Sequence, residues 1–233
     1  MTLPKIDLPI YEMELPSTGE TVKYRPFTVK EEKILLVAQA SKDSTQEMVA
    51  SKQIVNNCLI DYDVMKLAMF DLELILLTLR SKSVDNLIEM QITDPDTDET
   101  VDISIDLMDT EVIKNDKHSN QVKINDDYTL ILKYPSIDEY IRITEMDEDD
   151  PLVSYQIMVS CLDKVASEDE VYEFKKYSQK EIDQFMEDVT TPVVDGIRLF
   201  FETMPKIRHT KTYKNKNGDT KNFVIEGMRS FFT

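Results

Sequence analysis

Hydrophobic positions along the chain repeat with two periods, and the change of period divides the sequence into three segments. A spacing near 3.6, typical of helices, holds in the first and last segments, whereas a spacing of 2, typical of strands, holds in the middle. The expected segments are 1–82, 83–135 and 136–233, either separate or packed as one compact unit. The pattern predicts an α+β protein, mainly helical, with antiparallel β-hairpins in the middle and near both termini.

The first segment is predicted to be a hairpin followed by three helices. Strand-like runs at 10–15 and 21–25 flank a turn, and Thr28 with Glu31 has the spacing of a capping box that begins a helix. Further helices are expected at about 45–60 and at 64–79. The last of these is apolar nearly all round, which is typical of a central helix covered on several sides.

In the middle segment, Val101, Ile103 and Ile105 alternate with polar residues, and residues 88–92 form a matching run before an acidic turn. This alternation predicts antiparallel strands with one face exposed to water. A second hairpin is expected to pair 121–124 with 128–134. Residues 108–120 give no clear pattern.

The last segment is predicted to return to helices and to end in a hairpin. Ser136 and Ser178 are expected N-caps, Asp150-Pro151 an N-cap followed by N1, and Thr191-Pro192 the start of a helix that ends at Pro205. A short hairpin is expected around 167–170, and Asn217-Gly218 is expected to supply two positive φ angles to a tight turn. No long internal repeat or Gly/Ser linker is apparent.

The composition is that of a globular protein without a nucleic-acid or membrane partner. Hydrophobic residues make up 41% and charged residues 31% of the 233 residues, and the formal net charge is −18. Such a charge repels nucleic acid and anionic membranes. The N-terminus has no apolar signal region, and no stretch is expected to span a membrane. Cys58 and Cys161 are expected to be buried free thiols in a reducing compartment.

Candidate chemistry is sparse, and we expect no catalytic, cofactor-binding or metal-binding residues. Residues 83–113 contain ten acids and no Lys or Arg, with Asp94, Asp96 and Asp98 spaced as at the start of a calcium loop. The Gly and Glu that such a loop needs further on are missing, which favours a hydrated acidic hairpin tip. The histidines, His118 and His209, are expected at the surface, and the carboxylates of Asp147 and Asp149 are expected to be solvated.

Two features near the C-terminus are candidates for a partner interface. Residues 206–221 hold six cations against one acid, Asp219, on an otherwise acidic chain, which suits head-to-tail contacts between copies or an acidic partner. Phe231 and Phe232 either cap this protein's own core or insert into a neighbour. The six cations are Lys206, Arg208, Lys211, Lys214, Lys216 and Lys221.

Several sequence runs near both ends of the chain are similar to those of a known protein family. The runs are Leu8-Pro-Ile-Tyr-Glu-Met-Glu-Leu-Pro, Tyr24-Arg-Pro-Phe-Thr-Val-Lys-Glu-Glu, Ile197-Arg-Leu-Phe-Phe-Glu-Thr-Met-Pro, and Phe223-Val-Ile-Glu-Gly-Met-Arg-Ser-Phe-Phe, with support from 172–191. The chain resembles the baseplate hub and hub assembly proteins of T-even-type contractile-tailed bacteriophages.

The resemblance implies a non-enzymatic tail morphogenesis protein, found in the virion baseplate and, during assembly, in the host cytoplasm. Its implied partners are other hub or spike proteins and the tail tape-measure protein, with self-association as a further expectation. An alternative is a transient acidic chaperone of the tape measure that is absent from the mature virion, which strong acidity and twelve methionines suit. A metal-dependent hydrolase that uses the acidic middle segment is the alternative outside this class.

Overall fold

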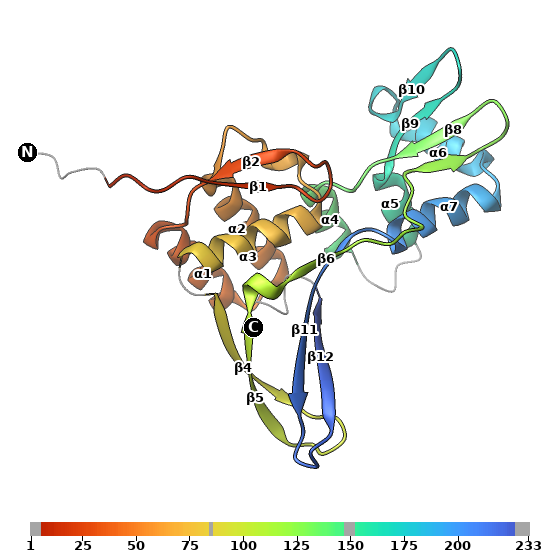
Figure 1. Cartoon of the computed structure of the whole chain (residues 1–233). Coiled ribbons are helices and arrows are strands. Elements are labelled where there is room, and N and C mark those ends of the chain that lie inside the picture. Colours follow the sequence, from red (N-terminus) through yellow and green to blue (C-terminus); the bar gives the residue numbers. More distant parts are fainter. Residues whose placement is uncertain (1–5, 84–85, 147–151, 227–233) are drawn as a thin grey trace, which may run out of the picture. The chain divides into compact units, whose positions relative to one another are not determined.

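A computed structural model describes residues 6–83, 86–146 and 152–226 (Figure 1). Among these residues there are seven α-helices and twelve strands in antiparallel sheets, so the fold is α+β as predicted. The expectation of a mainly helical chain is not confirmed, because 42% of these residues are helical and 28% lie in strands.

The chain forms two compact units. Unit 1 comprises residues 1–113 and 205–233, and unit 2 comprises residues 114–204. This division differs from the three consecutive segments that the sequence suggested. The reason is that the strand beginning at Lys206 pairs with a short strand at 111–113, which returns the end of the chain to unit 1.

In its described residues, unit 1 contains two three-stranded sheets, one two-stranded sheet and three helices. Its first part consists of β1 (Tyr11–Glu14), β2 (Thr21–Tyr24), α1 (Val29–Ser41), α2 (Ser44–Cys58), β3 (Leu59–Ile60), the 3-10 turn η1 (Val64–Lys66) and α3 (Met69–Ser83). Its second part consists of β4 (Leu87–Thr93), β5 (Thr100–Asp106), the 3-10 turn η2 (Leu107–Asp109), β6 (Glu111–Ile113), β11 (Lys206–Lys214) and β12 (Thr220–Glu226). The sheet orders are β1-β2-β3, β12-β11-β6 and β4-β5.

The central helix of unit 1 begins later than its sequence pattern predicts. Asp63 accepts a hydrogen bond from the Met65 amide and caps η1, so the run from Val64 starts as a 3-10 turn. The helix α3 starts anew where Asp71 accepts the Ala68 amide at 3.0 Å. As predicted, α3 is covered on several sides, and Leu72, Ile75 and Leu79 have no exposed surface.

Unit 2 contains a four-stranded sheet, of order β10-β9-β8-β7, and four helices. Its elements are β7 (Gln121–Lys123), β8 (Thr129–Leu132), α4 (Ile137–Thr144), α5 (Val153–Ser160), β9 (Leu162–Ala166), β10 (Val171–Glu173), the 3-10 turn η3 (Phe174–Lys176), α6 (Gln179–Asp188) and α7 (Thr191–Glu202). The core includes Leu130, Cys161, Ile197 and Phe200. The N-caps at Ser136 and Ser178 are confirmed, and each belongs to a capping box, whereas Asp150-Pro151 lies outside the described residues.

The two units repeat one arrangement that the sequence pattern does not reveal. Unit 1 runs hairpin, helix, helix, strand, 3-10 turn, helix, and unit 2 follows the same order with one more strand, β10, between its third strand and its 3-10 turn. In each unit the second and third strands pair antiparallel. The Arg25 amide donates to the Cys58 carbonyl at 3.0 Å, and the Lys133 amide donates to the Cys161 carbonyl at 2.8 Å. Each buried free cysteine therefore lies at the same place, immediately before the third strand.

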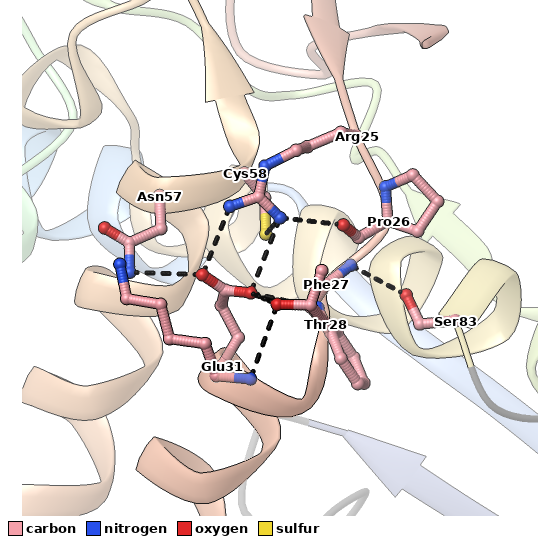
Figure 2. Close-up of polar contacts among 9 residues, drawn as sticks. Arg25, Pro26, Phe27, Thr28, Glu31, Asn57, Cys58 and Ser83 are labelled. Carbon is pink, nitrogen blue, oxygen red and sulfur yellow. Dashed lines mark hydrogen bonds and ion pairs between the residues drawn. The ribbon is translucent and has the colours of Figure 1, made fainter. Parts of the chain in front are cut away.

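A capping box and an ion pair also recur at matching positions. In unit 1, Thr28 and Glu31 form the box that begins α1, and Glu31 pairs with Arg25 at 3.1 Å (Figure 2). In unit 2, Ser136 and Glu139 form the box that begins α4, and Glu139 pairs with Lys133 at 3.0 Å. The spacing along the chain, six residues from cation to acid, is identical. Backbone pairing and helix capping together set this shared frame.

Burial and polar partners differ between the two ion pairs. The Glu31 side chain is 0% exposed and also accepts hydrogen bonds from the Thr28 amide and hydroxyl at 2.9 and 2.7 Å. Burial alone would raise the pKa of this carboxyl, but the bonds from Arg25 and Thr28 outweigh it and lower the pKa to about 2. The Glu139 side chain is 27% exposed, and its pKa is lowered in the same way by Ser136 and Lys133 against the effect of burial.

Candidate partner interface

The six predicted cations lie on the β11–β12 hairpin and its turn, in unit 1. Only Gly218 has a positive φ in this turn, at 85°, so the predicted pair of positive φ angles at Asn217-Gly218 is wrong. Asn215 instead closes a longer turn, because its side chain accepts the Asp219 amide at 2.9 Å and its carbonyl accepts the Gly218 amide at 3.0 Å. The hairpin itself is confirmed over seven residue pairs.

The acidic partner of this basic hairpin lies within the same unit. The β4–β5 hairpin and the β11–β12 hairpin lie side by side (Figure 1), and we call the two together the paired hairpins. Lys216 forms an ion pair with Glu99, and Lys221 forms one with Asp96. The Tyr213 hydroxyl donates to Asp94 at 2.7 Å. The charge asymmetry in the sequence is therefore partly neutralised inside unit 1.

Asp94 organises the acidic turn and is not part of a hydrated tip. Its side chain has no exposed surface and also accepts the amides of Asp96 and Thr97 at 3.1 and 3.0 Å. The bond from Tyr213 lowers the pKa of the Asp94 carboxyl and raises the pKa of Tyr213 itself. The prediction of a fully hydrated hairpin tip is thus wrong for Asp94, because the sequence does not show that Tyr213 would reach it.

Successive side chains of β11 lie on opposite faces of the strand, so the remaining cations lie on both faces. Lys206 and Lys214 are exposed, whereas Lys211 lies on the face shared with Ile207 and Tyr213 and is half-buried. Arg208 is exposed to an intermediate degree and pairs with Glu226 on the neighbouring strand. Lys206 and Lys214 therefore offer charge that no contact in the described part of the chain neutralises. Phe231 and Phe232 lie outside the described residues.

The prediction that both histidines lie at the surface is wrong for His209 and incomplete for His118. His209 is 3% exposed opposite Ile225, and burial lowers its pKa. His118, in unit 2, is half-buried, and burial lowers its pKa as well. Their positions in sheets and among aromatic rings, which depend on tertiary packing, are not visible in the local sequence.

The hydrogen bonds of His118 assign its tautomer. The Thr203 hydroxyl donates to the Leu199 carbonyl at 2.6 Å, so it accepts from His118 Nδ1 at 2.9 Å. Nε2 of His118 then accepts from the Tyr134 hydroxyl at 2.8 Å. The ring also stacks on Phe200 with centroids 4.9 Å apart. These contacts place His118 in a structural cluster of unit 2.

Other candidate chemistry is accounted for by packing. Cys58 and Cys161 are buried free thiols as predicted, and burial raises their pKa to about 11 and about 12. In the described ranges, no three His, Cys, Asp or Glu side chains gather closely enough to hold a metal ion. None of the helices in these ranges is long and apolar enough to cross a membrane. Asp147 and Asp149 lie outside the described residues.

Comparison with known proteins identifies the family. No curated protein and no solved structure matches the chain. A family described as T4 bacteriophage base plate protein matches residues 8–233, which include both units and the paired hairpins. The terminal runs noted in the sequence lie inside this match. The chain therefore belongs to the T4-type phage baseplate protein family.

Proposed function

We propose that this protein is a non-enzymatic component of the baseplate hub, or an assembly factor for it. The observation that carries the proposal is the family match over residues 8–233, which makes it a baseplate protein and implies a place in the virion tail. The hub assignment is the finer step and is supported by the resemblance of both chain ends to hub and hub assembly proteins.

The paired hairpins supply a surface suited to protein partners. In the described part of unit 1, β12 has a single strand neighbour, so its other edge has free backbone donors and acceptors. Such an edge can accept a strand from another chain. Lys206 and Lys214 add positive charge on the outward face of β11. We propose other hub or spike proteins and the tape-measure protein as partners at this surface, with acidic or strand-forming segments as the recognised feature.

A transient chaperone that leaves before the virion is complete is the second candidate. The observation in its favour is an apolar surface on α1 and α2, where large side chains are 50–71% exposed. These residues are Leu36, Val37, Val49 and Val29. Exposed apolar surface of this kind suits the temporary cover of an aggregation-prone partner. The chaperone would work in the host cytoplasm during assembly.

A metal-dependent hydrolase would require free carboxylates on the acidic hairpin. At its tip, Asp94 is occupied by turn amides and Tyr213, Asp96 by Lys221, and Glu99 by Lys216. This use of the acids in structural contacts supports the non-enzymatic proposal. Hydrolase activity that appears only with an added divalent metal, and that disappears in Asp96→Asn, would contradict it.

Quantitative mass spectrometry of purified virions, normalised to the spike protein, tests the proposal. A simple stoichiometric ratio to the spike is expected of a permanent hub component. Absence from virions together with abundance in infected-cell lysate would identify the transient chaperone instead. Presence in virions at a copy number that matches peripheral baseplate proteins would overturn the hub assignment and leave the family assignment intact.

A further inference from the structure

Unit 2 contains an apolar groove between one end of its sheet and α6. The groove has a volume of about 390 Å³, which lies within the range of about 300–1,000 Å³ of ligand sites. Its walls are aliphatic and aromatic, from Ile124 and Tyr128 beside the β7–β8 turn to Ile182 and Phe185 on α6. Glu181, at the first turn of α6, is its one charged lining residue in the described part of the chain.

The corresponding position in unit 1 has a buried side chain where unit 2 has the groove. Leu15, the first residue after β1, has no exposed surface, whereas its counterpart Ile124, the first residue after β7, is half-exposed. In both units this residue's amide donates to the carbonyl of the residue before the second strand, Glu20 or Tyr128. The chain between the two strands is one residue shorter in unit 2. Unit 1 therefore fills with its own turn a space that unit 2 leaves open.

The acid at the helix start shows the same difference. Asp71 at the start of α3 accepts the Ala68 amide through Oδ2 and the Ser17 amide of the β1–β2 turn through Oδ1, at 3.1 Å. Glu181 holds the matching position, and its Oε2 accepts the Ser178 amide at 2.8 Å. Oε1 of Glu181 has no hydrogen-bond partner among the described residues. The groove thus has room for an apolar side chain and an acceptor for a donor group.

We propose that this groove receives residues 227–233 of a second copy of the chain. That segment, Gly-Met-Arg-Ser-Phe-Phe-Thr, lies outside the described residues and begins directly after β12. It carries Phe231 and Phe232 for the apolar walls and Arg229 for Glu181, and it has no acidic side chain. Its chemistry therefore matches both features of the groove, an apolar interior and a carboxylate at the rim.

Charge around the groove favours a basic segment as its occupant. The β7–β8 and β9–β10 turns lie at the same end of the sheet, because Thr129 pairs with Ala166. These turns carry five acids, of which Asp126 pairs with Lys123. The acids are Asp126, Asp127, Glu168, Asp169 and Glu170. Residues 227–233 carry Arg229 and no acidic side chain, so their side-chain charge is opposite to that of the two turns.

Photo-crosslinking between isotopically distinct copies tests the proposal. A full chain labelled with nitrogen-15 and carrying a photoreactive phenylalanine analogue at position 231 is mixed with unlabelled chain and irradiated. Cross-linked peptides should join labelled 227–233 to unlabelled groove peptides that contain Tyr128 or Ile182. Cross-links confined to one copy, or to peptides outside the groove, would overturn the proposal.

Matched variants in the unlabelled copy sharpen the test. Ile182→Arg places a charge in the groove and should reduce the intermolecular cross-links at least tenfold. Leu199→Arg makes the same kind of change at a 46% exposed position of unit 2 and should leave them unchanged. Glu181→Gln keeps a capping-box residue at the start of α6 and should reduce them several-fold. Unchanged cross-linking in folded Ile182→Arg, or in Glu181→Gln if Ile182→Arg does not fold, would contradict the proposed contact.

Discussion

The two units use one backbone frame with different side-chain chemistry. In both, the second strand pairs with the third, and a capping box begins the first helix beside a cation–acid pair. In unit 1 the acid is Glu31, with no exposed side-chain surface, whereas in unit 2 it is Glu139, which is 27% exposed. The frame rests on backbone hydrogen bonds and caps that many sequences can supply. The energetic importance of the ion pair depends on burial, which the frame does not fix.

The units also differ in what covers the start of their third helix. Unit 1 closes this place with Leu15 and with the Ser17 amide on Asp71, whereas unit 2 leaves Glu181 facing an apolar groove. The turn that precedes the second strand is one residue shorter in unit 2. Two units with the same backbone arrangement can therefore differ at this place, so that one is closed and the other has an open groove.

Removing the cation of each ion pair should give the largest difference in folding free energy between the two units. Arg25→Met leaves the buried Glu31 carboxylate without its charge partner and should cost about 3–5 kcal/mol of folding free energy. Lys133→Met leaves a carboxylate that water reaches and should cost less than about 1 kcal/mol. Urea unfolding of both variants measures the difference. Equal losses would show that burial does not distinguish the pairs.

Gly196 tests the packing of α7 on β7 in unit 2. The first part of unit 1, which ends at α3, has no helix that corresponds to α7. Ala usually stabilises a helix relative to Gly by about 1 kcal/mol. At Gly196 of α7, however, an added Cβ would lie 2.5 Å from Val122 Cγ1 on β7. Gly196→Ala should therefore destabilise unit 2 by about 1–3 kcal/mol.

Val122→Ala provides the matched control, because it removes the methyl groups that the new Cβ would meet. Combined with Gly196→Ala, it should show a favourable coupling in a double-mutant cycle of thermal unfolding. Additive losses from the two changes would contradict a direct clash between α7 and β7.

How much of this could be read from the sequence depends on the range of each interaction. The capping boxes at Thr28, Ser136 and Ser178 were predictable, because partner and cap are three residues apart. The burial of His209 and the bond from Tyr213 to Asp94 were not, since the latter joins residues 119 positions apart. The repeat was hidden because the residues that match between the units are few and widely spaced, such as Glu31 with Glu139 and Cys58 with Cys161, whereas the rest of the frame rests on backbone pairing.

The basic hairpin shows the same limit for the candidate interface. Its charge was visible in the sequence, but the assignment of Lys216 and Lys221 to acids of the neighbouring hairpin required the fold. Alternation along β11 separates Lys206 and Lys214 from Lys211, and the ion pair with Glu226 separates them from Arg208. A sequence thus identifies the charge available to an interface more readily than the charge left for a partner.

Lowering the pH should weaken the buried ion pair of unit 1, with a smaller loss of folding free energy than the mutation of Arg25 causes. The pKa of Glu31 in the folded chain is about 2, below its ordinary value of 4.5, so its ionised form is stabilised by folding. This contribution is complete above pH 4.5 and is lost as the pH falls toward about 2. Glu31→Gln, which can keep the capping box, should flatten the stability profile between these pH values. An unchanged slope would exclude Glu31 as a source of the pH dependence.

The smallest expected effect is on the rate of thiol modification at neutral pH. Cys58 reports on the opening of unit 1 and Cys161 on the opening of unit 2. Cys58 in unit 1 and Cys161 in unit 2 are 0% exposed, and burial raises the pKa of both thiols to about 11 and about 12. A thiol reagent should therefore modify the native protein only when a unit opens, because the thiolate is the reactive form. Arg25→Met should speed labelling of Cys58 and leave Cys161 unchanged, whereas Gly196→Ala should do the reverse, as peptide mass spectrometry would measure. Equal acceleration of both thiols in either variant would mean that the units open together, and that the shared frame, not the individual ion pair or helix contact, sets their stability.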